Sequence, residues 1–154
     1  MRIANKLTFV KVLEITNIHF MATSTVIYQG DLRTECTHLK SGQTIITDAP
    51  TDNHGMGEAF SPTDLAATSL GCCMITVMNI AANGRGITIE KMRADVTKVM
   101  AANPRRISEI TVDVKIEGEF SQEQKRLLED IGRNCPVALS LHPDIKQNIT
   151  FHFE

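Results

Sequence analysis

The sequence predicts a protein of the α+β class. Three observations favour this class: stretches of alternating apolar and polar residues occur at both ends of the chain, a long helix-like apolar stretch separates them, and strands and helices do not alternate regularly. With 154 residues, of which 42% are hydrophobic and 22% charged, the chain can bury a core without disulfides or a structural metal. We expect one domain over residues 21–154.

Residues 1–20 are predicted to be an extension outside this domain. Met21 begins a stretch that resembles a natural start, and Lys11 and Glu14 interrupt what would be the apolar part of a signal peptide. Without an export signal we expect a reducing, cytoplasmic environment. The net charge of −2 gives no reason to expect nucleic acid or an anionic membrane as a partner, and no apolar run is long enough to span a bilayer.

A hairpin is predicted at the start of the domain. Residues 23–38 alternate loosely and are rich in Thr, Val, Ile and Tyr, so we interpret them as one strand. Residues 39–42 form a turn and 43–49 a second strand. The following residues, up to the next helix, are dense in Gly, Pro, Asn and Asp, which indicates a loop.

A long helix is predicted from Ser61 to the glycines at 84 and 86. Ser61 suits the N-cap, Pro62 the first helical position, and Asp64 the positive end of the helix dipole. Apolar and small residues occupy nearly every face, so the helix must be buried between a sheet and a second body, for which another copy of the chain is a candidate.

The remaining elements follow from periodicity and capping. Residues 87–101 and 105–120 alternate and predict two long antiparallel strands. Residues 121–134 predict an amphipathic helix capped by Ser121, and 137–141 a short helix after Cys135 and Pro136. Residues 146–153 predict a last strand.

The cysteines at 36, 72, 73 and 135 are the residues with the most chemical potential. Cys135 precedes Pro136, so its sulfur lies at a helix N-terminus, where the dipole favours a thiolate; packing of the elbow is the alternative. Cys73 lies about three turns into the long helix, and would need a nearby cation to ionise. Cys72 points to a different face of that helix.

Two motifs together are similar to a known family. "SPTDLAATSLGCCMITVM", followed further along by "NCPVALSL", resembles the family of osmotically induced protein C and organic hydroperoxide resistance protein, the OsmC/Ohr family, over about residues 22–154. The resemblance implies an intertwined homodimer with antiparallel sheets wrapped around long central helices. It also implies a thiol peroxidase in which Cys73 attacks the peroxide, Cys135 resolves the product, and Arg33 in "GDLRTEC" stabilises the thiolate.

One position departs from the family pattern. Where the family's peroxidases carry a glutamate after the motif proline, which holds the arginine, this chain has Thr63. Asp64 is next to it, but one residue along a helix turns the side chain away. Thr63, Asp64 and Glu58 are therefore supporting candidates, the last in the loop before the helix, where solvated polar residues are common.

Two functions remain open. The resemblance implies reduction of organic hydroperoxides in oxidative stress defence, with no metal, flavin or haem and with an external dithiol reductant, often lipoyl-linked in the family. The alternative is a non-catalytic dimer that binds a small hydrophobic or electrophilic ligand in the same pocket. No Cys-x-x-Cys or His-x-x-x-His spacing supports a metal site.

Overall fold

The computed structural model describes residues 22–154, and the predicted extension at 1–20 lies outside them. The α+β class is confirmed, with six strands and three α-helices in the described chain. The strands are β1 (Ser24–Gly30), β2 (Arg33–His38), β3 (Thr44–Asp48), β4 (Lys91–Ala102), β5 (Arg105–Glu117) and β6 (Lys146–Phe153). The helices are α1 (Pro62–Asn83), α2 (Gln122–Arg133) and α3 (Pro136–Ser140), and a short 3-10 helix, η1 (Thr51–Asn53), lies in the loop before α1.

The prediction of a single strand over residues 23–38 was wrong, because this stretch contains two strands joined by a tight turn. Gly30, Asp31 and Leu32 all have positive φ, at 92°, 48° and 60°, and this left-handed run reverses the chain. The hydroxyl of Tyr28 accepts a hydrogen bond from the Leu32 N–H at 3.2 Å, which closes the turn. The order β1-β2-β3 makes an antiparallel first sheet.

The second sheet, with the order β4-β5-β6, carries the core on one face. β4 and β5 pair antiparallel, as predicted, and β6 pairs parallel with β5. A parallel pair needs a crossover, which α2 and α3 supply. Alternate side chains of β5 are fully buried, namely Ile110, Val112, Val114 and Ile116, and they form one cluster with residues of all three helices.

Helix α1 begins as the sequence predicts. The Ser61 hydroxyl accepts the Asp64 N–H at 3.1 Å, and the Asp64 carboxylate accepts the Ser61 N–H at 2.8 Å, so the first turn has a complete capping box. Leu70, Met74 and Met78 form a fully buried stripe that belongs to the core.

The opposite side of α1 is open in the single chain. Cys72 is exposed and Ile80 is 65% exposed. The helix is therefore not buried all round by its own chain, and a second body that covers it stays a prediction.

Helix α1 also corrects the expectation that no segment could span a bilayer. Its 22 residues have a window of mean hydropathy 1.7, which suffices by length and composition. Ser, Thr and Asn interrupt the apolar run, but Ala, Met, Ile and Val keep its average high. A core helix of a globular domain passes the same test, and α1 packs on the second sheet.

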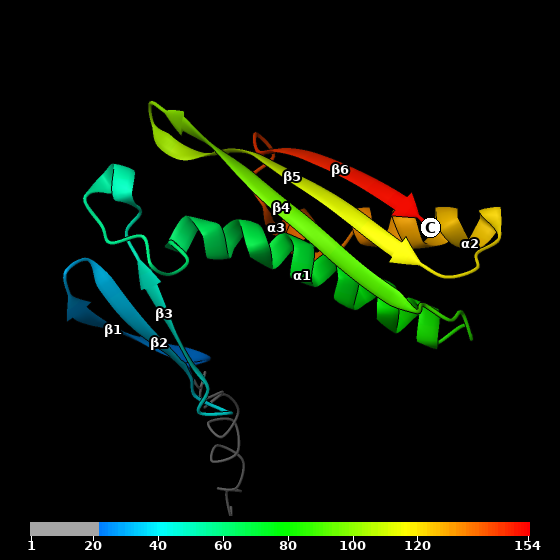
Figure 1. Cartoon of the computed structure of the whole chain (residues 1–154), viewed down its shortest axis with the longest axis horizontal. Coiled ribbons are helices and arrows are strands. Elements are labelled where there is room, and N and C mark those ends of the chain that lie inside the picture. The colour runs from blue at the N-terminus through cyan, green and yellow to red at the C-terminus, as the bar shows by residue number, and fades with distance from the viewer. Residues whose placement is uncertain (1–21) are drawn as a thin grey trace, which may run out of the picture.

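The first sheet lies near the N-terminal end of α1, apart from the second sheet (Figure 1). Only Thr47 and Asp48 of its strands are buried. Five of its large apolar side chains are between 45% and 64% exposed: Val26, Ile27, Tyr28, Ile45 and Ile46. The first sheet therefore has no apolar core of its own within the described chain.

Candidate functional site

The fold brings Cys73 and Cys135 together from distant parts of the sequence. Cys73 lies in the middle of α1, and Cys135 is the N-cap of α3, which packs against α1. The Gln147 side chain donates a hydrogen bond to the Ala138 carbonyl at 3.0 Å and so ties α3 to β6. Cys135 is 1% exposed, Cys73 is partly buried, and both are free thiols that lie near enough for Cys73 to affect the pKa of Cys135.

The Cys135 thiol is held in its protonated form. Burial raises its pKa above the ordinary value, and the neighbouring Cys73 thiol raises it further. The Ala138 N–H donates to its sulfur at 3.4 Å, which acts in the opposite direction but is outweighed. The sequence pattern favours a lowered pKa for Cys135 at the helix terminus. The structure shows the opposite net effect, because burial of the thiol away from solvent outweighs the helix terminus.

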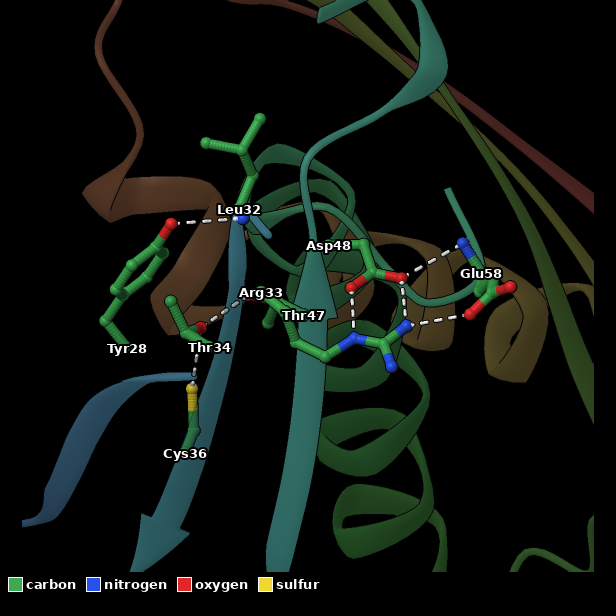
Figure 2. Close-up of polar contacts among 8 residues, drawn as sticks. All are labelled: Tyr28, Leu32, Arg33, Thr34, Cys36, Thr47, Asp48 and Glu58. Carbon is green, nitrogen blue, oxygen red and sulfur yellow. Dashed lines mark hydrogen bonds and ion pairs between the residues drawn. The ribbon is translucent and has the colours of Figure 1, made fainter. Parts of the chain in front are cut away.

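Arg33 lies at the start of β2, where two carboxylates hold it (Figure 2). Its Nε and Nη2 donate to the two oxygens of Asp48 at 2.6 and 2.8 Å, and Nη2 also donates to Glu58 at 2.9 Å. The hydrogen bonds from Arg33 hold the pKa of the Asp48 carboxyl below its usual range, and the same contacts raise the Arg33 pKa. Arg33 and Asp48 are therefore both charged at neutral pH.

The three supporting candidates separate in the structure. Glu58 contacts Arg33, whereas Thr63 and Asp64 contact other groups. The Thr63 hydroxyl lies 3.1 Å from that of Ser61, and the Asp64 carboxylate is bound by Ser61 and by the ammonium of Lys98.

Asp48 was missed by sequence reasoning. The signal that could have found it is register, since Arg33 and Asp48 are direct partners across β2 and β3. The predicted hairpin, with its turn at residues 39–42, already sets residue 33 opposite residue 48.

One chain does not bring Arg33 to the two thiols. Within residues 22–154, the hydrogen-bonding partners of the Arg33 side chain are Asp48 and Glu58, and neither cysteine is among them. The first sheet, which carries Arg33, lies apart from the helices that carry the thiols (Figure 1).

An open groove of about 820 Å³ lies between β3 and the loop that leads into α1. Its apolar lining includes Ile45, Ile46 and Phe60, and Glu58 and Asp64 contribute carboxylates. Among residues 22–154, including this groove, no group of three or more His, Cys, Asp or Glu side chains is arranged to hold a metal ion.

Comparison with known proteins gives a consistent result. The family model of OsmC-like proteins matches residues 55–150. A Psychrobacter arcticus structure, named for an osmotic stress induced and detoxification response, is 52% identical, has a TM-score of 0.83, and covers 86% of this chain and 96% of its own. No curated protein matches significantly.

More distant structures share the fold. An OsmC-like protein from Mycoplasma pneumoniae has 21% identity and a TM-score of 0.72, with 84% of this chain and 94% of its own covered. An organic hydroperoxide resistance protein from Legionella pneumophila has 15% identity and a TM-score of 0.69, with 86% and 98% covered.

Proposed function

Because the chain belongs to the family of OsmC-like proteins, we propose that it is a thiol-dependent peroxidase that reduces organic hydroperoxides in oxidative stress defence. The observation that carries the proposal is the proximity of Cys73 and Cys135, which come from two helices that pack together and lie near enough for one thiol to affect the other. When two free thiols lie near each other, one can be oxidised to a sulfenic acid and then form a disulfide with the other without a rearrangement of the fold.

The surroundings of the two sulfurs support different roles. Cys73 is the less buried of the two, so peroxide can reach it. Cys135 is buried and its raised pKa keeps it a thiol, so it is a poor first nucleophile. Because each charge disfavours the other, the pair carries one thiolate at a time, and we assign that thiolate to Cys73.

The reaction then has three steps. The Cys73 thiolate attacks the terminal peroxide oxygen, the O–O bond breaks, and the alkoxide leaves and takes up a proton to give the alcohol. The resulting sulfenic acid condenses with the Cys135 thiol, which forms the disulfide and releases water. An external dithiol then reduces the disulfide by exchange and is itself oxidised. We propose a lipoyl-linked dithiol protein as this reductant and the cytoplasm as the location.

We propose a homodimer as the active form, with Arg33 of one protomer beside the thiols of the other. The exposed side of α1 and the exposed apolar residues of the first sheet support this assembly, because association would remove both from water. The proposal also accounts for the separation of Arg33 from both cysteines of its own chain. In the dimer the guanidinium stabilises the thiolate and the departing oxygen.

Stopped-flow oxidation by cumene hydroperoxide tests the function. Wild type and Cys72→Ser should lose thiols rapidly, while Cys73→Ser should not react. Cys135→Ser should react once and stop at a sulfenic acid that dimedone traps. If no variant reacts faster than free cysteine, the peroxidase proposal is wrong and the alternative stands, a dimer that binds a small apolar or electrophilic ligand, for which the apolar groove is the favouring observation.

A further inference from the structure

The two carboxylates that hold Arg33 differ in how firmly they are fixed. The Asp48 side chain is 1% exposed, whereas that of Glu58 is 68% exposed and lies on the loop between η1 and α1. Asp48 can leave Arg33 only if the end of β3 unfolds locally. Glu58 can turn into solvent at little cost in free energy.

Asp48 is fixed by the strand register and by the backbone around it. It is the direct partner of Arg33 across β2 and β3, so both side chains leave the sheet on the same face. Its own N–H donates to the Phe60 carbonyl at 3.1 Å, and its carboxylate accepts the Glu58 N–H at 3.0 Å. The carboxylate therefore belongs to the folded framework that joins the first sheet to α1.

The contact with Asp48 sets the plane of the guanidinium and leaves one side of it open. Asp48 takes Nε and Nη2 of Arg33 in a two-pronged contact, which fixes orientation as well as charge. Nη1 has no acceptor among residues 22–154. Figure 2 shows this nitrogen on the far side of the guanidinium from both Asp48 contacts.

The polar residues Thr63 and Asp64 at the start of α1 do not contact Arg33. Thr63 carries no charge, and Asp64 is already bound by Ser61 and Lys98. Residue 63 therefore cannot hold the arginine as the family's glutamate does, and of the two carboxylates that contact Arg33, Asp48 is the one that binds it through two nitrogens.

The charge balance assigns a different part to Glu58. Arg33 with two carboxylates carries a net negative charge, and a negative group does not stabilise a nearby thiolate. We propose that Asp48 is the positioning residue that orients Arg33 toward the Cys73 thiolate, and that Glu58 is an exchangeable partner that competes with this thiolate for the guanidinium. The inference rests on that part of the proposed function which sets Arg33 beside Cys73 in the homodimer.

The test is the pH profile of Cys73 alkylation by iodoacetamide, followed by mass spectrometry in the full chain with Cys72→Ser as background. Glu58→Gln should move the midpoint of this profile about one pH unit lower, because it removes a charge that competes for Arg33. Asp48→Asn should raise it by a similar amount, because Arg33 loses its orientation. Glu119→Gln, which removes a charge from an exposed site away from Arg33, should leave it unchanged.

A purely structural role of Asp48 would not shift the alkylation profile in the direction opposite to Glu58→Gln. Shifts of the same sign in both variants, or no shift in either, overturn the proposal. Thermal unfolding shows whether Asp48→Asn folds, and if it does not, Glu58→Gln decides alone, since an unchanged or raised midpoint refutes the competition. A protein with opposite shifts that does not reduce cumene hydroperoxide refutes the proposed function and leaves this inference standing.

Discussion

Replacement of Gly71 by alanine tests how closely α1 approaches the second sheet next to the thiol pair. Gly71 is buried two residues before Cys73. A methyl group at this position would lie 2.7 Å from Cγ2 of Val96 and 3.5 Å from Cβ of Ala94. Carbon atoms pack without strain at roughly 3.5–4.0 Å, so the first contact requires the helix or the strand to shift.

The expected magnitude is the balance of two terms. Overpacking of a core costs about 1–3 kcal/mol, and a β-branched neighbour on a strand has little freedom to yield. Alanine in a helix is about 1 kcal/mol more favourable than glycine. The net loss for Gly71→Ala is therefore about 1 kcal/mol, or roughly 3 °C in melting temperature for a chain of this size.

Urea unfolding followed by circular dichroism, at one protomer concentration throughout, measures this loss. Gly84→Ala is the matched control, because Gly84 has a φ of −66° and a methyl group there meets nothing closer than 3.5 Å, so it should be neutral or stabilising. Adding Val96→Ala should relieve the clash, so the double variant should be more stable than the sum of the single effects. If Gly71→Ala alone stabilises the protein, the close approach of α1 to β4 is refuted.

Three further predictions concern capping, pH and thiol reactivity. Ser121→Ala should lower the free energy of unfolding by about 1 kcal/mol in urea titrations, because it removes the side-chain cap of α2, and an unchanged midpoint would contradict this. Burial raises the pKa of Asp64, but the hydrogen bonds from Lys98 and Ser61 outweigh it and the net pKa is lowered. Its stabilising effect is therefore present above the unfolded-state pKa and lost as pH falls through the folded one, so Asp64→Asn should be less stable than wild type at pH 7, by a margin that narrows as the pH falls below the unfolded-state pKa. Cys135 should resist iodoacetamide at pH 7.5 until urea unfolds the protein; fast labelling of the native state, read by mass spectrometry, would argue against its burial.

Local patterns predicted most of the second half of the fold. Some features depend on only a few neighbouring residues and can therefore be predicted from the sequence. They are the helix caps at Ser61 and Ser121, the alternation of β5 and the helix start at the proline after Cys135. The parallel pairing of β6 with β5 was not predicted, because strand direction depends on a crossover and on contacts between distant residues.

The first sheet was less predictable for a related reason. The turn at residues 30–32 includes Leu32 with a positive φ, which its residue type does not favour, so the alternation continued through it unnoticed. Asp48 could have been found from the sequence, since the predicted turn at residues 39–42 already sets it opposite Arg33. The two cysteines, in contrast, were found by motif, and the burial that reverses the expected effect on Cys135 appeared only with the fold.

The first sheet buries no apolar side chain of its own strands within the described chain, and this has a consequence for newly synthesised protein. Residues 24–48 leave the ribosome before the second sheet does, yet strand pairing alone gives so small a sheet little stability. If the proposed homodimer forms, an unpaired protomer would expose this region to cellular proteases, and dimerisation would shield it. Degradation would then remove unpaired protomers and leave the proposed dimers intact.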